Sequence, residues 1–209
     1  MKHRMSVLLL TALALALSTA PQVIASPVTY SIDRSHTEAG FEVRHFFSKV
    51  HGRFKEVSGT IVFDEQDAKN IIVDATAQTA SIWTDDDKRD AHLRSPAFFA
   101  ADTFTTLTFK STSVQPAGTN KYKVAGNLTM RGVTRAVTFD GEFLGAAAIG
   151  VGGQAWGTKA GFTATTVVNR QDYGIKWNKT LDSGGLMLDD KVTIVLNVEA
   201  NKVEKTEAK

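Results

Sequence analysis

Residues 37–47 read Thr-Glu-Ala-Gly-Phe-Glu-Val-Arg-His-Phe-Phe, a stretch in which the side chains alternate in polarity. Every second side chain points to the same face of a β-strand, so this period of two predicts a strand with one buried face. Glu38, Glu42 and Arg44 form the polar face. The opposite, inward face is predicted to carry Thr37, Ala39, Phe41, Val43, His45 and Phe47.

The same alternation recurs along the chain, in further runs that begin at Val57, Ile71, Leu107, Tyr122, Val137, Phe162 and Val192. The segments 64–69, 116–120 and 130–132 carry the Asp, Pro, Asn and Gly residues that form tight turns. Short connections between successive strands indicate antiparallel pairing. Thirteen of the 16 glycines lie from Gly118 onward, and glycine within a strand marks a bulge or a bend. We therefore expect an all-β fold of about eight strands whose sheet curls back on itself.

One segment interrupts the strand pattern. Residues 84–87 (TDDD) offer Thr84 as a capping residue and negative charges that favour the start of a helix. Oppositely charged residues spaced i,i+4 follow, which stabilise a helix. Ser95 before Pro96 is typical of a second helix start. The segment therefore predicts a short helical insert that continues through Phe98 and Phe99.

The N-terminus is typical of an exported protein. Lys2 and Arg4 precede an apolar run of eleven residues, and small residues near Ala25 favour cleavage there. The run is shorter than the roughly 20 residues that span a bilayer, so no stable membrane span is expected after cleavage. Without Lys2 and Arg4 the cations equal the 22 anions, which removes the electrostatic basis of nucleic-acid binding. The chain has no cysteine, so its core alone must stabilise it.

Motifs for catalysis or metal binding are absent from the sequence. His36, His45, His51 and His92 match no metal-ligand spacing, and no G-x-S-x-G nucleophile motif occurs. We therefore expect no metal and no catalytic residue. The 12 phenylalanines and 3 tryptophans are many for one β domain. A barrel of eight strands is either filled by such side chains or holds one small ligand, and composition leaves both readings open.

Several motifs, in the same order, resemble those of the YceI-like family of periplasmic polyisoprenoid-binding proteins. The resemblance covers residues 28–200, although residues 144–156 are richer in Gly and Ala than the family pattern. The matching segments are residues 30–36 (YSIDRSH), 41–45 (FEVRH), 52–54 (GRF), 59–61 (GTI), 89–95 (RDAHLRS) with Phe98 and Phe99, 126–135 (GNLTMRGVTR), and 169–174 (NRQDYG).

The resemblance implies a lipocalin-like antiparallel β-barrel with a long apolar tunnel that holds a polyisoprenoid or a similar long-chain amphiphile. It also implies a periplasmic location, no cofactor and no enzymatic activity. The expected organisation is a signal peptide at residues 1–25, a barrel domain at residues 26–200 and a polar C-terminal tail at residues 201–209. A second copy of the chain, in a homodimer, is a further candidate partner.

Inward-facing residues of the alternating runs, with three from the helical insert, are the expected tunnel lining. They are Phe41, Val43, Ile61, Phe63, Ile71, Val73, Leu93, Phe98, Phe99, Leu107, Phe109, Leu128, Val137, Phe139, Phe162, Ala164, Ile194 and Leu196.

Five polar residues have two readings, a site for the ligand's headgroup or structural ion pairs and hydrogen bonds. They are Arg44, His45, Arg89, His92 and Arg170. Two other functions are weighed against lipid binding. One is a hydrolase-like enzyme with His45 or His92 as general base beside an acid such as Asp90. The other is a filled β module that binds a partner through its surface.

Overall fold

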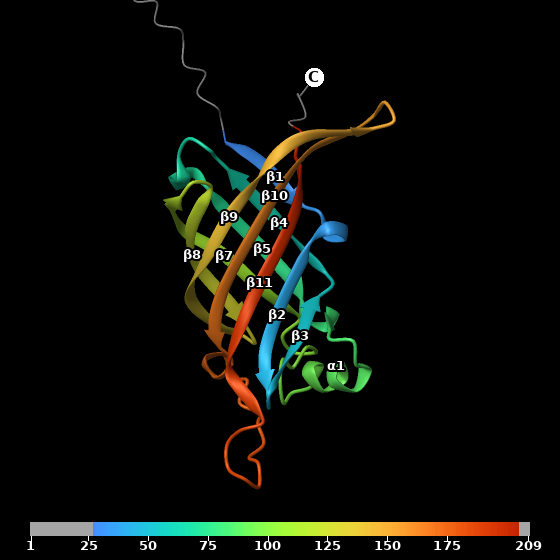
Figure 1. Cartoon of the computed structure of the whole chain (residues 1–209), viewed down its shortest axis with the longest axis vertical. Coiled ribbons are helices and arrows are strands. Elements are labelled where there is room, and N and C mark those ends of the chain that lie inside the picture. Colours follow the sequence, from blue (N-terminus) through green and yellow to red (C-terminus); the bar gives the residue numbers. More distant parts are fainter. Residues whose placement is uncertain (1–26, 205–209) are drawn as a thin grey trace, which may run out of the picture.

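The computed structural model describes residues 27–204, so the predicted signal peptide and residues 205–209 lie outside the described residues. Its strands form one antiparallel sheet, and eight of them close into a ring (Figure 1). The ring strands are β1 (Val28–Ile32), β4 (Val57–Phe63), β5 (Ile72–Gln78), β7 (Thr106–Gly118), β8 (Lys121–Met130), β9 (Val133–Val151), β10 (Gln154–Asn169) and β11 (Leu188–Lys202). This arrangement confirms the predicted antiparallel barrel.

Pairing between the first and last strands closes the ring. Tyr30 of β1 lies opposite Lys202 of β11, and Ile32 lies opposite Ala200. The strand β11 therefore continues to Lys202, two residues beyond the predicted end of the barrel at residue 200. We call the end of the barrel where this pairing occurs the terminal end, and the opposite end, where α1 (Asp87–Arg94) lies, the helix end (Figure 1).

The wall at the helix end continues beyond the ring. There β11 pairs with β2 (Glu38–His45), which pairs with β3 (Ser48–Phe54), which in turn pairs with β6 (Ile82–Trp83). The alternation predicted for residues 37–45 holds, because Phe41 and Val43 face inward. Phe47, placed on the same face by the pattern, is instead fully exposed. It follows β2 in a turn that Phe46 enters with φ of 52°, so the strand geometry has ended there.

The helical insert contains one helix and not two. Asp86, rather than Thr84, caps α1, since its side chain accepts a hydrogen bond from the Arg89 amide at 3.0 Å. Ser95 ends the helix by donating its backbone N–H to the His92 carbonyl. The expected second helix is wrong: residues 96–99 form turns, in which the Phe99 amide returns to the Leu93 carbonyl.

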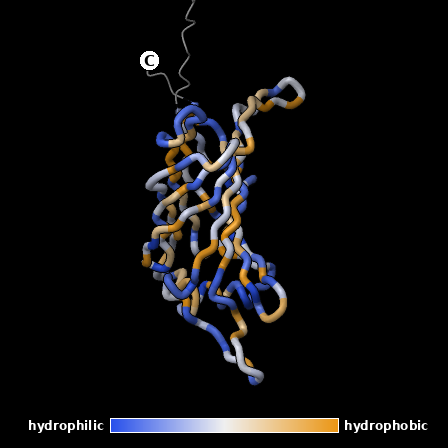
Figure 2. The backbone as a smooth tube through the Cα atoms, turned by 60° about the vertical axis from the view of Figure 1, so that its left-hand side comes forward, coloured by the Kyte–Doolittle hydropathy of each residue, from blue (hydrophilic) through white to orange (hydrophobic). Residues whose placement is uncertain are grey.

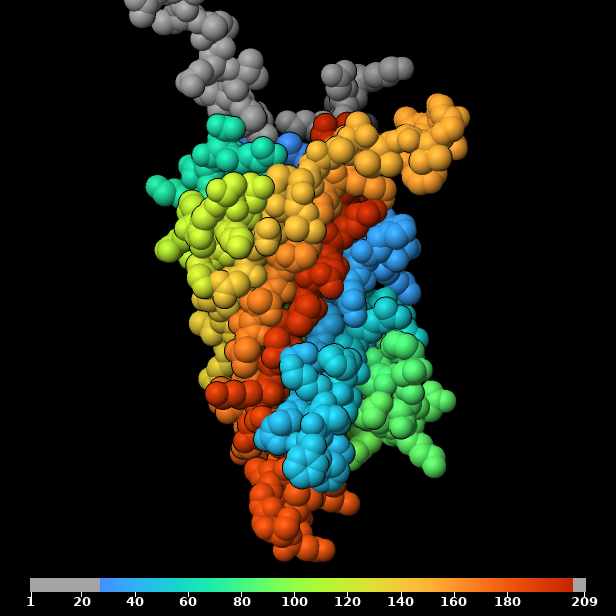
Figure 3. Space-filling model, viewed as in Figure 1, coloured from blue at the N-terminus to red at the C-terminus, as the bar shows by residue number. Residues whose placement is uncertain are grey.

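Beyond the ring at the terminal end, β9 and β10 extend as a two-stranded ribbon (Figures 1 and 2). Gly152 and Gly153 form its tip with φ of 60° and 81°, a left-handed turn that glycine adopts without strain. The ribbon projects from the body of the molecule (Figure 3), and Leu144, Val151 and Trp156 are exposed on it. The Gly- and Ala-rich segment is therefore an extension of two barrel strands.

A charged cluster joins the bend between β1 and β2 to the neighbouring strands. The Nζ of Lys159 donates to Asp33 Oδ2 at 3.1 Å, Glu199 Oε1 at 2.7 Å and Asn201 Oδ1 at 2.9 Å. The His36 ring lies 3.1 Å from Asp33 Oδ2. Asp33, His36 and Glu199 are also close enough together to hold a metal ion, but both carboxylates already form ion pairs with the ammonium of Lys159.

The hydrogen bond from His36, together with those from Lys159, the Ser35 amide and Asn201, lowers the pKa of Asp33 well below its usual range. A carboxyl whose pKa is lowered on folding stabilises the fold above its unfolded pKa of about 3.9. That stability is lost as the pH falls through the lower pKa of the folded state.

We predict that Asp33→Asn lowers the free energy of unfolding by about 1–3 kcal/mol at neutral pH, because it weakens charged hydrogen bonds. The difference from wild type should narrow below about pH 4, as the Asp33 carboxyl of the unfolded wild-type chain becomes protonated, and should disappear only as the pH falls through the lower pKa of the folded state. Urea unfolding of both proteins between pH 7 and pH 2 measures this difference in the free energy of unfolding. Asp74→Asn, at an exposed pair with Lys110, is the control and should change stability little. A difference that stays constant with pH would contradict the assigned role.

Candidate functional site

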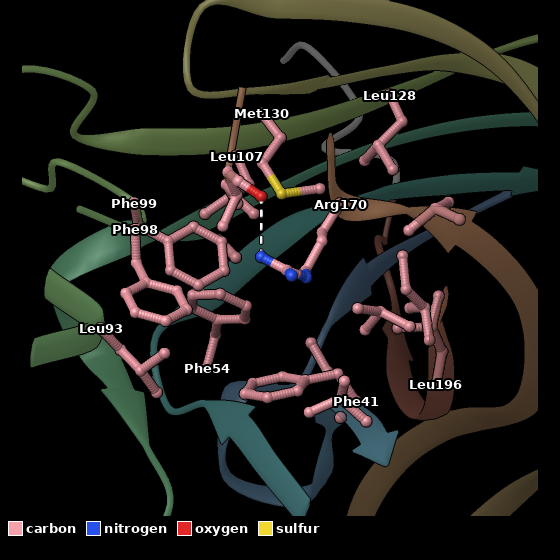
Figure 4. Close-up of a pocket in the computed structure, with 18 of the residues that line it drawn as sticks. Phe41, Phe54, Leu93, Phe98, Phe99, Leu107, Leu128, Met130, Arg170 and Leu196 are labelled. Atoms are coloured by element: carbon pink, nitrogen blue, oxygen red, sulfur yellow. Dashed lines mark hydrogen bonds between the residues drawn. The ribbon is translucent and has the colours of Figure 1, made fainter. Parts of the chain in front are cut away.

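The barrel encloses an apolar cavity of about 510 Å³ that extends toward the helix end. Side chains from β2, β7, β8 and β11 form its wall, and residues of α1 and of the segment 175–188 line it at the helix end. Figure 4 shows Phe41, Phe54, Leu107, Leu128 and Leu196 pointing toward one another around this space. An apolar lining of this kind offers few hydrogen-bond partners to water.

The structure places eleven of the eighteen expected lining residues around the cavity. They come from five strands, from α1 and from the turn after it. They are Phe41, Val43, Leu93, Phe98, Phe99, Leu107, Phe109, Leu128, Phe139, Ile194 and Leu196.

The other seven do not line the cavity. Ile61, Phe63, Ile71, Val73 and Phe162 belong to a filled core at the terminal end. Val137 packs against the core at the helix end, and Ala164 is not among the lining residues. The period-two pattern assigns a side chain to the inner or outer face of a strand, but it carries no information about height along the barrel. The bore is therefore not a through tunnel, since its terminal end is filled.

Some residues that line the cavity were not predicted from the sequence. Phe54 and Val57 lie at the β3–β4 connection, and Met130 ends β8 just before a turn. Ile175 and Trp177 lie in an irregular segment where no alternation exists to indicate an inward face. A motif did mark this region, because residues 169–174 directly precede the segment.

His45 and His92 both line the cavity. The His92 ring, on the exposed side of α1, packs against both Phe98 and Trp177, with its centroid 4.9 Å from each of theirs. The His45 ring packs against Phe46 at 4.2 Å. The two imidazoles are therefore among the polar groups of a lining that is mostly apolar.

Arg170 is 4% exposed and is held by hydrogen bonds rather than left free for a ligand. Its guanidinium donates to the carbonyls of Asp189, Ile175 and Trp177 at 2.9, 2.9 and 2.7 Å, and to Asp190 Oδ1 at 2.9 Å. Figure 4 shows the side chain at the edge of the cavity, with one hydrogen bond dashed. Arg170 thus ties the segment that lines the helix end of the cavity to the start of β11.

The residues around Arg170 explain its motif locally. Asn169 caps the short 3-10 helix η4 (Arg170–Tyr173) by accepting the Gln171 amide, and Gly174 ends it with φ of 76°. Tyr173 is 1% exposed, and burial raises the pKa of its phenol to about 12. The motif therefore builds a turn with a buried arginine and a buried, protonated tyrosine.

Arg89 and Arg44 make structural contacts. Arg89 lines the cavity and donates to Thr84 Oγ1 at 2.7 Å and to the Thr84 carbonyl at 2.6 Å, while Thr84 Oγ1 donates to buried Asp90 at 2.5 Å. Arg44 lies outside the cavity, exposed, and pairs with Asp189 at 3.2 Å. These contacts hold α1 and the start of β11 in place.

Arg131, which the sequence did not single out, has a similar role. It has a left-handed backbone with φ of 52°, and its guanidinium donates to the carbonyls of Phe98, Gly174 and Pro96 at 2.9–3.0 Å. It joins the turn after α1 to the turn after η4. A single cation thus connects two irregular segments at the helix end.

Fold and site together define the class: a lipocalin-like antiparallel barrel with an internal apolar cavity. The chain belongs to the YceI-like domain family, whose model matches residues 30–200. It is 36% identical over 170 residues to a UPF0312 protein of Vibrio parahaemolyticus, covering 79% of this chain and 87% of that one.

Solved structures agree with this assignment. A YceI protein of Campylobacter jejuni is 31% identical with a TM-score of 0.64, over 83% of this chain and 97% of that one. A domain from Saccharophagus degradans, described as polyisoprenoid binding and implicated in plant cell wall breakdown, shares the fold at 15% identity. Its TM-score is 0.62, over 84% of this chain and 99% of that one.

We predict that Arg170→Met destabilises the fold by about 3 kcal/mol or more, because it leaves buried carbonyls and Asp190 without their donor. Arg44→Met, at the exposed pair, should cost less than about 1 kcal/mol. Urea unfolding measures both. A stable Arg170→Met variant that binds ligand more weakly would instead support a role for Arg170 at the ligand's headgroup.

Proposed function

We propose that this protein binds a polyisoprenoid or a similar long-chain amphiphile in its cavity, and carries, stores or sequesters it in the periplasm. The observation that carries the proposal is the cavity itself, which is large enough for a ligand and lined mostly by aliphatic and aromatic side chains. The description of the Saccharophagus degradans domain as polyisoprenoid binding adds support.

The apolar lining can supply useful affinity. Burying hydrocarbon contributes about 0.8 kcal/mol per methylene group before the cost of ordering the ligand is subtracted. Binding pockets of about 300–1,000 Å³ hold one drug-sized ligand, and this cavity lies within that range. Chain carbon in the cavity would leave a polar headgroup near His45 and His92.

The two alternatives receive less support. For a hydrolase-like enzyme, His45 and His92 line the cavity, but Asp90 does not, and its carboxylate accepts a hydrogen bond from Thr84. For a filled module acting only through its surface, the cavity would have no purpose. Membership of the YceI-like family also favours a binding protein over an enzyme.

The periplasmic part of the proposal rests on the N-terminal sequence, with cleavage after Ala25. Among residues 27–204, no helix has the length and apolar character needed to cross a bilayer. Cell fractionation, with determination of the mature N-terminus, tests this part separately from ligand binding.

We predict that protein purified without detergent releases a long-chain amphiphile into organic solvent, identifiable by mass spectrometry. Delipidated protein should take up farnesol, with displacement of a fluorescent apolar probe as the readout. Ala77→Phe adds a ring to the cavity wall and should weaken binding by at least about tenfold, since it fills space that the ligand needs.

Val167→Phe is the matched control, because it adds a larger side chain to the exposed face of β10 and should bind like wild type. Equal binding by Ala77→Phe and wild type would place the ligand outside the cavity. Preparations that are empty and take up no prenyl lipid would contradict the proposed function.

A further inference from the structure

Four aromatic rings from four strands fill the barrel at its terminal end. Phe63 of β4 lies 4.4 Å from Phe143 of β9 and 5.4 Å from Phe162 of β10, between ring centroids. Phe162 is also 5.4 Å from Phe143 and 6.2 Å from Tyr30 of β1. Phe162 therefore contacts the other three rings, which we call, together with it, the aromatic plug.

The register of the strands places the aromatic plug directly above the cavity. Phe162 lies opposite both Phe143 and Val198, and the next inward position toward the helix end pairs Ala164 with Leu196. Leu196 and Val198 line the cavity, whereas Phe143 and Phe162 do not. The cavity thus ends within one inward position of the plug.

The plug is closely packed. Tyr30, Phe63 and Phe143 are each less than 10% exposed, and they belong to one core with Ile61, Val114 and Ala200. Their rings meet edge to face or tilted, the arrangements that aromatic pairs prefer. A ligand chain that enters from the helix end cannot pass without displacing close-packed rings.

We propose that the aromatic plug sets the length of hydrocarbon that the cavity accepts, with Phe162 as the main determinant. The proposal rests on the proposed function and narrows its ligand class. A methylene group occupies about the volume of a water molecule, roughly 30 Å³, so the cavity of about 510 Å³ holds roughly seventeen such groups. That corresponds to a prenyl chain of three to four isoprene units, and the remainder of a longer chain stays outside.

The consequence is a break in the dependence of affinity on chain length. Each added isoprene unit should strengthen binding, by about tenfold after ordering costs, while apolar cavity remains to be filled. Once the chain reaches the plug, further units meet water or the protein surface and add little. Affinity should therefore level off near four units.

The experiment measures dissociation constants for prenyl alcohols of two to eight isoprene units by probe displacement, at one detergent concentration. Phe162→Ala should move the break to a chain longer by about one unit, since this large-to-small core change removes a ring of about the size of one isoprene unit and leaves a cavity in its place. Phe162→Leu should move it less. Leu196→Phe narrows the inner end of the cavity and should move the break to shorter chains.

Phe47→Ala removes the same ring from an exposed site and should leave the wild-type profile unchanged. The variants with opposite expected effects keep the test decisive even if Phe162→Ala does not fold. Wild-type affinity that rises steadily to eight units, or unchanged profiles in folded Phe162→Leu and Leu196→Phe, would overturn the length limit while leaving the proposed function intact. Absence of binding at every length would contradict the proposed function itself.

Discussion

Closure of the antiparallel ladder is the constraint on which the structure depends. When β1 pairs with the end of β11, the ring has no open edge there, and inward side chains are separated from water by a continuous wall. The pairing between β1 and β11 is short. The charged cluster of Asp33, Lys159 and Glu199 adds side-chain contacts that join the end of β1 to β10 and β11. Closure makes an apolar interior stable whether or not side chains fill it completely.

The interior is filled unevenly, and this unevenness defines the site. At the terminal end, rings from four strands meet and leave no bore. Toward the helix end, small side chains such as Ala75 and Ala77 of β5 lie opposite Phe109 and Leu107 of β7, and the wall continues through β2, β3 and β6. The result is an apolar pocket closed at one end, a shape that suits the proposed chain-like ligand.

Irregular segments form the helix end, and cations hold them. Arg170 and Arg131 direct their guanidinium groups to backbone carbonyls that no sheet ladder satisfies. A planar group with five donors suits this role, because it satisfies several carbonyls from different segments at once. The polar residues of the family motifs at this end are thus explained largely by architecture, with His45 and His92 remaining as polar groups of the cavity lining.

The sequence by itself determined the barrel, its antiparallel order and the inward face of most strands, because side-chain alternation and turn residues are local properties. It also indicated that the residues around Arg170 matter, through their motif. Only the tertiary structure decided that Phe41 and Leu107 line a cavity while Phe63 and Phe162 plug one, although all four alternate alike. That distinction depends on strand register and on which rings meet across the barrel, contacts between residues far apart in the chain that no local pattern encodes.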